Sequence, residues 1–226
     1  MQNPVSDRRH DHQQPDNSWF FELGKTIGLS IVLALSIRTF VAEARWIPSG
    51  SMEPTLHGTP NQWEADKIIV DKLSYKFSIP QRGDIVVFSP TEELQREQFQ
   101  DAFIKRIVAL PEDKVELRSG KVYINDKPLQ EENYLGSLQK TSIEVCNSAA
   151  TQPFLSTAQT IPPDSYLVLG DNRGSSYDSR CWGVVPRENI IGKAVLRFWP
   201  LNKVGGIDKN PLYSNQEALQ DKIESK

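Results

Sequence analysis

Apolar positions divide the chain into an N-terminal hydrophobic block and a long series of short apolar runs. Residues 1–18 are polar and cannot bury a core, so we expect a polar tail without packed structure. The hydrophobic block at residues 19–42 follows, with a short uncharged stretch at its centre. A membrane-spanning helix needs about 20 apolar residues. The block reaches this length if Glu22, Lys25 and Arg38 lie near the membrane interfaces.

The residues of this block leave three interpretations open. It can be a single membrane anchor, a buried core helix, or a cleaved signal peptide that ends at the small-x-small sequence Ala42-Glu43-Ala44. Aromatic residues at 19–21 and Trp46 fit the two interfaces of a bilayer, which favours the anchor. Basic residues lie at both ends, so charge does not fix the orientation of the block.

After the hydrophobic block, short runs rich in Val, Ile and Phe alternate with turn sequences. KIIVDKL, GDIVVFS, AFIKRIVAL and SYLVLGD are such runs, and PQRGD, LPEDK and IPPDS are such turns. VELRSGKVYI predicts a hairpin that turns at Ser119-Gly120. Helical periodicity is strongest at residues 91–103. We therefore predict a mostly β protein, with an antiparallel β domain at residues 43–204 and a polar C-terminal tail at residues 205–226.

Composition and charge argue against several classes of function. The 226 residues include 26 basic and 29 acidic side chains, a net charge of -3, and they form no basic stripe, so nucleic acid is not an expected partner. Histidine and cysteine are too few and too scattered to predict a metal site. Cys146 and Cys181 allow one disulfide at most, and they also fit two separate buried thiols.

Three polar segments carry candidate chemistry. The first, IPSGSMEPTLHG at residues 47–58, holds two serines around Gly50, between prolines that keep the segment out of a central strand. At a sheet edge, such a segment can accept an extended peptide as an added strand. On its residues alone, an ordinary Ser-Gly-Pro loop explains the segment at least as well.

The second segment, AFIKRIVALPEDKV, places a lysine among apolar residues. As a strand over residues 102–110, one face would carry Phe103, Lys105, Ile107 and Ala109, and the other Ile104, Arg106, Val108 and Leu110. Burial disfavours the ammonium form of lysine and lowers its pKa toward the range where a neutral amine can accept a serine proton. A lysine at a sheet edge that extends to water is the alternative.

The third segment, LGDNRGSSYDSRCWG at residues 169–183, predicts a tight turn rich in hydrogen bonds. Asp178 and Arg180 can form a charge pair that fixes the loop. The hydroxyl of Ser176 can orient an amine. A purely structural loop is the simpler interpretation of the segment by itself.

The three segments occur together and in this order, and through them the chain resembles type I signal peptidases, membrane-bound serine endopeptidases that remove signal peptides from exported proteins. PSGSMEPTL resembles the nucleophile box of that family, RGDIVVF a second box, FIKRIVALPEDKV the lysine box, and GDNRGSSYDSRCWG the last box. The likeness spans residues 20 to about 199. It implies an antiparallel β catalytic domain on the outer side of a bacterial-type plasma membrane or a thylakoid-type membrane, without metal or cofactor, and it favours the anchor interpretation.

The resemblance also implies roles for individual residues. Ser51 would be the nucleophile and Lys105 the general base, and the hydroxyl of Ser49 with the backbone amide of Ser51 would form the oxyanion hole. Supporting roles would fall to Ser176, which holds the lysine amine, and to Asp178 and Arg180, which fix its loop. Pockets for small side chains before the cut would be lined by Ile47, Pro48, Met52, Leu56, Phe103 and Ile104. The implied partners are signal peptides of exported preproteins and the lipid bilayer.

One departure from the family pattern concerns the loop after Lys105, because the lysine box usually has glycines where Ala109 and Glu112 stand here. Three other interpretations compete with the resemblance. A soluble, self-cleaving Ser-Lys peptidase of the repressor type is disfavoured by the hydrophobic block. A membrane-tethered β module could bind extended peptides without catalysis. A Ser-His enzyme would have to use His57, which is the one histidine outside the polar tail.

Overall fold

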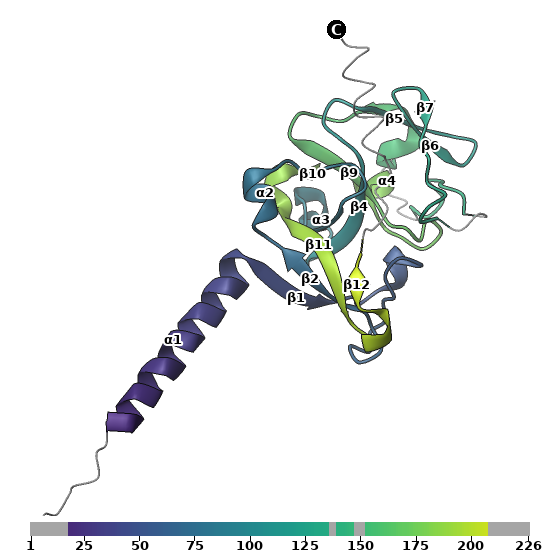
Figure 1. Cartoon of the computed structure of the whole chain (residues 1–226). Helices are drawn as coiled ribbons and strands as arrows, with labels where there is room; N and C mark the ends of the chain where they lie inside the picture. The colour runs from purple at the N-terminus through teal and green to yellow at the C-terminus, as the bar shows by residue number, and fades with distance from the viewer. Residues whose placement is uncertain (1–17, 136–138, 147–151, 208–226) are drawn as a thin grey trace, which may run out of the picture.

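A long N-terminal helix projects from a β domain in the computed structural model, which describes residues 18–135, 139–146 and 152–207 (Figure 1). Helix α1 spans Ser18–Phe40. Within the described ranges it is the one helix long and apolar enough to cross a membrane, and none of that apolar stretch is buried inside the protein. The predicted N-terminal apolar helix is confirmed. Nearly all of the predicted polar tail lies outside the described residues.

The β domain contains two sheets, and every strand pairing in them is antiparallel. The larger sheet has the strand order β1-β2-β11-β3-β4-β9-β10, and β12 pairs with β11. Its strands are β1 (Ala42–Trp46), β2 (Lys67–Asp71), β3 (Ile85–Phe88), β4 (Phe103–Ala109), β9 (Ser165–Leu169), β10 (Val185–Pro186), β11 (Ile190–Trp199) and β12 (Gly205–Gly206). The predicted mostly β, antiparallel fold is confirmed, and β12 carries the sheet into the segment expected to be a polar tail.

The smaller sheet has the order β7-β6-β5-β8. Its strands are β5 (Lys114–Arg118), β6 (Lys121–Ile124), β7 (Lys127–Pro128) and β8 (Gln159–Thr160). Strands β5 and β6 form the predicted hairpin, with Arg118 opposite Lys121. Ser119 and Gly120 both have positive φ angles, 50° and 79°, as a tight two-residue turn between antiparallel strands requires.

Short helices connect the strands. They are α2 (Ser74–Phe77), α3 (Glu92–Arg96), α4 (Ser179–Trp182) and the 3-10 turns η1 (Gly50–Met52), η2 (Phe154–Ser156), η3 (Arg187–Asn189) and η4 (Leu201–Lys203). Helix α3 is shorter than the periodicity at residues 91–103 predicted. It begins after Thr91, whose hydroxyl accepts a hydrogen bond from the Leu94 amide. It ends because Gln98 takes a φ of 68°, which a helix cannot continue through.

Three apolar clusters fill the β domain, and β3 separates the first two because its alternate side chains point to opposite faces. The first cluster includes Val86, Phe88, Ile107, Val168 and Trp182. The second includes Ile85, Val87, Ile104 and, from the segment after β1, Ile47, Met52 and Leu56. The third lies between β9 and the smaller sheet, and includes Val108, Val115, Val122, Leu167 and Leu169.

The side-chain alternation predicted around Lys105 holds in the first part of β4 and is wrong after it. Phe103 and Ile107 contact the first cluster, as expected for residues of one face. Ala109 was expected on that face but packs in the third cluster, while Leu110 joins the first. The register between β4 and β9 shifts between Ile107 and Ala109. This bulge reverses the faces of the residues that follow it.

Glu112 is one of the two positions at which the lysine box departs from the family pattern. Its φ is 69°, a left-handed backbone conformation that favours glycine. The backbone of the loop therefore keeps a shape that suits glycine although the side chain differs. Its amide donates a hydrogen bond to the carbonyl of Ile161, which ties the loop to the segment after β8.

Candidate active site

Ser51 lies on the η1 turn, which follows strand β1 along the chain. Both Ser51 and Met52 are buried. Met52 packs in the second cluster with Ile47 and Leu56, so apolar side chains anchor the turn on both sides of the serine. These apolar side chains hold the turn, and the Ser51 hydroxyl faces Lys105 of β4.

Lys105 projects from β4 toward this serine. Its Nζ lies 2.8 Å from Ser51 Oγ and 3.0 Å from the carbonyl oxygen of Ile104. The lysine is 4% exposed. Pairing of β4 with β9 begins at Arg106, so Lys105 stands just before the point where the second neighbouring strand joins. The structure therefore brings together the two residues that the sequence put 54 positions apart.

Burial lowers the pKa of Lys105 from 10.5 to about 8. The nearby carboxylates of Asp178 and Asp171 raise this pKa, and the Arg180 guanidinium lowers it. Desolvation dominates because a buried ammonium loses its water and gains no carboxylate in direct contact. Near pH 8 a large share of the amine is neutral, and a neutral amine at this distance can accept the hydroxyl proton of Ser51.

Ser49 lies on the exposed side of the same turn. Its hydroxyl donates a hydrogen bond to Ser51 Oγ at 3.3 Å. Ser49 takes an extended backbone conformation immediately before η1. A second hydroxyl therefore stands next to the candidate nucleophile, on the side from which a peptide could approach.

Asp178 and Arg180 form the charge pair that the sequence predicted, and both are fully buried. Two guanidinium nitrogens of Arg180 donate to the two carboxylate oxygens, each at 2.8 Å. The amide of Gly170 donates to the same carboxylate at 3.0 Å. Burial alone would raise the pKa of Asp178, but Arg180 and the Gly170 amide hold it below its usual value. The loop is thus fixed by an ionised pair.

Ser176 makes no hydrogen bond to the lysine among the described residues. Its Oγ is buried and has no hydrogen-bond partner among the described residues, although it lies close enough to Asp178 to help lower the pKa of that carboxyl. It packs against Gly170: a Cβ added to that glycine would lie 2.2 Å from Ser176 Oγ and 2.4 Å from the Ser51 carbonyl oxygen. Ser176 therefore borders the nucleophile turn, and its predicted contact with the amine stays a prediction.

Sequence reasoning missed a residue that holds the nucleophile turn directly. The side-chain amide of Asn172 donates to the Gly50 carbonyl at 3.0 Å, and its backbone amide donates to the Ser51 carbonyl at 3.1 Å. The last box is thereby joined to the nucleophile box by two hydrogen bonds. An asparagine in a turn is usually explained by local hydrogen bonding, so the sequence offered no signal for this role.

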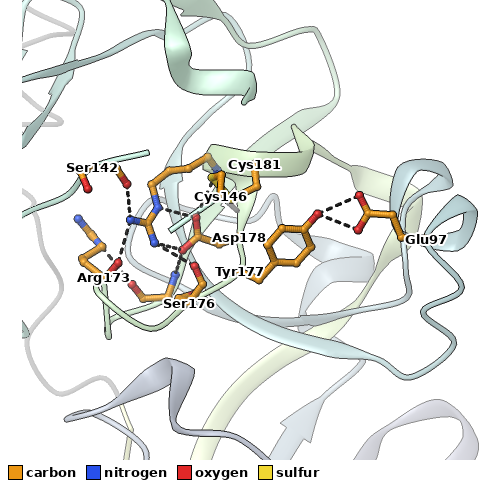
Figure 2. Close-up of a disulfide and its surroundings, with 10 residues drawn as sticks. Glu97, Ser142, Cys146, Arg173, Ser176, Tyr177, Asp178 and Cys181 are labelled. Atoms are coloured by element: carbon orange, nitrogen blue, oxygen red, sulfur yellow. Dashed lines mark hydrogen bonds and ion pairs between the residues drawn. A yellow bond between two sulfur atoms is a disulfide. The ribbon is translucent and has the colours of Figure 1, made fainter. Parts of the chain in front are cut away.

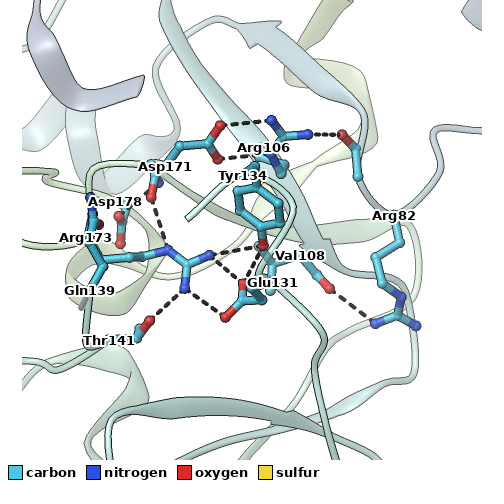
Figure 3. Close-up of polar contacts among 12 residues, drawn as sticks. Arg82, Arg106, Val108, Glu131, Tyr134, Gln139, Thr141, Asp171, Arg173 and Asp178 are labelled. Carbon is cyan, nitrogen blue, oxygen red and sulfur yellow. Dashed lines mark hydrogen bonds and ion pairs between the residues drawn. The ribbon is translucent and has the colours of Figure 1, made fainter. Parts of the chain in front are cut away.

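A buried ion pair beside Lys105 was also missed (Figure 3). Arg106 donates two hydrogen bonds to Asp171, at 2.8 and 2.7 Å, and a third to the Gly83 carbonyl. Asp171 also accepts from the Thr55 hydroxyl at 2.5 Å. The pair therefore links β4, the last box and the end of the nucleophile box. Its partners lie 65 positions apart, and Asp and Arg are too common for sequence to pair them.

A second buried network ties Glu131, Gln139 and Thr141 to the last box (Figure 3). Arg173 donates to Glu131 and to the Thr141 hydroxyl, and its backbone amide donates to Gln139. Burial would lower the pKa of Arg173, but Glu131 reverses this and raises it, so the pair is ionised. These three residues, which lie between β7 and β8 along the chain, are thus structural partners of the site.

The two cysteines form a disulfide, which decides between the alternatives that the sequence left open (Figure 2). Cys146 and Cys181 are separated by 35 positions, and their Cα atoms are 5.2 Å apart. Cys181 lies in α4, next to Arg180. The bridge therefore attaches the described residues 139–146 to the last box at a second point.

His57 is not placed for Ser-His chemistry. Its Nδ1 lies 2.5 Å from Glu53 Oε1, and its side chain is 49% exposed. Across the part of the chain that the structure describes, no group of three or more His, Cys, Asp or Glu could hold a metal ion. Of the residues considered for acid–base chemistry, Lys105 is the one that reaches Ser51.

A buried lysine that is hydrogen-bonded to a serine, on a tight turn of an antiparallel β domain, is the arrangement expected in serine peptidases that use lysine as the base. A family model described as "Signal peptidase, peptidase S26" matches residues 20–199. The chain therefore belongs to the signal peptidase family S26, and it is a serine-type peptidase.

Relatives agree with this assignment. "Signal peptidase I" of Leptolyngbya laminosa is 51% identical over 191 residues, which cover 84% of each chain. "Probable signal peptidase I-2" of Synechocystis sp. is 49% identical over 191 residues, 84% of this chain and 78% of the relative. "Thylakoidal processing peptidase 1, chloroplastic" of Arabidopsis thaliana is 38% identical over 188 residues, which cover 81% of this chain and 49% of that protein.

Proposed function

We propose that this protein is a membrane-anchored serine endopeptidase that removes N-terminal signal peptides from exported proteins, cutting after small residues in sites of the Ala-x-Ala type. The observation that carries the proposal is the 2.8 Å contact between Lys105 Nζ and Ser51 Oγ, in a site where burial lowers the lysine pKa to about 8. The names of the relatives support the substrate class.

In the proposed mechanism, neutral Lys105 accepts the Ser51 hydroxyl proton while Oγ attacks the scissile carbonyl. The hydroxyl of Ser49 and the backbone amide of Ser51 donate hydrogen bonds to the oxyanion that develops. The Lys105 ammonium then gives its proton to the leaving amine, and the acyl-enzyme forms. A water molecule, deprotonated by the same amine, hydrolyses the acyl-enzyme and restores both residues.

The supporting residues keep the base in place and set its charge balance. The ionised pair of Asp178 and Arg180 changes the lysine pKa less than either charge would alone, because the two act in opposite directions. Desolvation therefore remains the dominant influence. Among the described residues the buried Ser176 hydroxyl makes no hydrogen bond of ordinary geometry, although Asp178 lies near it. Such a group gains from a new hydrogen bond, which supports its role in holding the amine as substrate binds.

The substrate pockets are proposed on the face of the sheet that carries the second cluster. Ile47, Met52, Leu56 and Ile104 pack together there, and the exposed Pro48 follows Ile47. Ile47, Met52 and Leu56 are at most 1% exposed, so they can form only the floor of a pocket. Phe103 packs with the first cluster instead, so we propose that it borders the site beside Lys105 rather than this pocket floor. A shallow pocket with an apolar floor suits alanine-sized side chains and excludes larger ones.

The membrane is the second proposed partner. Helix α1 is apolar and unburied, and it leads into β1 with one residue between them, so the β domain would stand close to the bilayer surface. We place this domain on the extracytoplasmic side of a bacterial-type plasma membrane or of a thylakoid-type membrane. Tethering would bring the site to substrates that are themselves inserted in the membrane.

The proposal is tested by cleavage of a peptide with an Ala-x-Ala site, in detergent, by the full chain and three variants. Ser51→Ala and Lys105→Ala should abolish cleavage, while His57→Ala should keep it, because His57 contacts Glu53 and not the dyad. Activity that survives either of the first two substitutions would contradict a catalytic role for the Ser51–Lys105 pair. A folded wild-type protein that binds the peptide without cutting it would favour the peptide-binding module.

A further inference from the structure

Three aromatic rings form a row that begins at Phe103, next to Lys105, and we call Phe103, Phe99 and Tyr177 the aromatic ledge. The ring centroids of Phe99 and Phe103 are 5.4 Å apart, and those of Phe99 and Tyr177 are 6.1 Å apart. Phe99 is 40% exposed, and the other two residues are partly exposed. The ledge is therefore an apolar surface that solvent or a bound peptide can reach.

The ledge is held in place from two sides. Phe103 stacks on the fully buried Phe88, with centroids 5.8 Å apart. The Tyr177 hydroxyl donates to the Glu97 carboxylate, whose oxygens lie 2.7 and 2.9 Å away (Figure 2). Burial, together with that carboxylate, raises the pKa of Tyr177, so the hydroxyl stays a donor. A surface fixed in this way loses little conformational entropy when it binds a peptide.

The position of the base decides which part of a substrate meets the ledge. Lys105 must deliver its proton to the leaving amine, so that nitrogen has to come within about 3 Å of Nζ. The leaving amine belongs to the first residue after the cut. The Phe103 ring centroid lies 5.7 Å from the same Nζ. Residues after the cut therefore start next to Phe103.

The residues before the cut take the other direction. Their proposed pockets lie on the second cluster, which Ile104 reaches from one face of β4, while Phe103 packs with the first cluster on the opposite face. From Phe103, the ledge continues through Phe99 to Tyr177. Its two ring-to-ring distances together match about three residues of extended chain.

We propose that the aromatic ledge binds the first three residues after the cut and favours an apolar side chain among them. This inference rests on the proposed function. The Glu97 carboxylate is exposed at the rim of the ledge and gives it a negative charge. An acidic side chain in the same part of the substrate would lose the apolar contact and meet this charge. The ledge thus adds selectivity on the side of the cut that becomes the mature protein.

The test uses the full chain in detergent and pairs of peptides with the same Ala-x-Ala site. Each pair differs at one of the first three positions after the cut, with Leu in one peptide and Asp in the other. We expect wild-type kcat/KM to favour Leu by about tenfold at one position or more. Phe99→Ala should reduce that preference about fivefold, as expected for loss of one partly exposed apolar contact.

Phe77→Ala is the matched control, because Phe77 is an exposed phenylalanine on α2, at 84%, outside the ledge. It should keep the wild-type preference. Tyr177→Ala removes a different ring of the ledge, so it should also reduce the preference, and it serves if Phe99→Ala does not fold.

Cleavage of all peptides without preference, or a preference that Phe99→Ala leaves unchanged, overturns the ledge and leaves the proposed function standing. If Phe99→Ala does not fold, a preference unchanged in Tyr177→Ala overturns the ledge in the same way. No cleavage of any peptide by folded wild-type protein overturns the proposed function itself.

Discussion

Gly170→Ala perturbs the active site through one methyl group. The added Cβ would lie 2.4 Å from the Ser51 carbonyl oxygen and 2.2 Å from Ser176 Oγ, and ordinary contacts begin at 3.4 Å. The serine side chain can rotate away, but the carbonyl belongs to the nucleophile turn, so the turn must move by about 1 Å. A displacement of this size at a catalytic group costs about 100-fold in rate. Overpacking of a tight site also costs about 1–3 kcal/mol of stability.

The assay is kcat/KM with an Ala-x-Ala peptide, together with a thermal melt. We expect kcat/KM to fall by about two orders of magnitude, and Tm to fall by a few degrees. Gly174→Ala is the matched control in the same loop, because a Cβ there has no atom within 4 Å, and it should behave like wild type. Full activity of Gly170→Ala would refute the claim that the last box sets the position of Ser51.

Other predictions concern stability. Lys105→Met should be inactive yet more stable at pH 7 by up to about 3 kcal/mol, because the folded wild type holds a lysine whose pKa is lowered to about 8. Between about pH 8 and 10.5 the folded state binds fewer protons than the unfolded state, so the free energy of unfolding of the wild type should rise with pH in urea titrations. The same rise in Lys105→Met would contradict this account. Arg106→Leu leaves the buried Asp171 unpaired and should cost about 3–5 kcal/mol, and Arg106→Leu/Asp171→Leu should recover part of that loss; an equal loss in the double variant argues against the pair. Replacing Cys146 and Cys181 together by serine frees a loop with a separation of 35 residues and should cost about 3–4 kcal/mol, which an unchanged urea midpoint would disprove.

Local sequence signals predicted the parts of the fold that local physics controls. The β5–β6 hairpin follows from a Ser-Gly turn between alternating runs, and both turn residues take the positive φ angles that it needs. The apolar N-terminal block forms one long helix. The serine and lysine boxes were recognised as a set, and the structure brings Ser51 and Lys105 into contact.

Features that depend on distant partners could not be predicted from the sequence. Alternation failed at Ala109 because a bulge forms where β4 meets β9, and a bulge depends on the partner strand. Helix α3 stops early at Gln98, a residue with no strong preference for ending a helix. The disulfide and the bond from Arg173 to Glu131 join segments 35 and 42 positions apart, and no short-range pattern records such pairing.

The same limit applies to the candidate site. Ser49 contacts Ser51 and Arg180 pairs with Asp178, and both contacts lie within a single box, where local sequence can indicate them. Asn172 was missed because its importance comes from two carbonyls of another box. Sequence therefore indicated contacts within a box better than contacts between boxes, and the catalytic roles of these residues stay predictions.

The pH dependence of kcat/KM for the full chain tests the central claim most directly. If Lys105 is the base, activity should rise with pH as the amine loses its proton, with an apparent pKa near 8, where burial places it. This rise of kcat/KM with pH should have the same apparent pKa in His57→Ala. An apparent pKa near 10.5, the ordinary value for lysine, would contradict a buried base. An apparent pKa of about 6.5 that disappears in His57→Ala would assign the base to histidine.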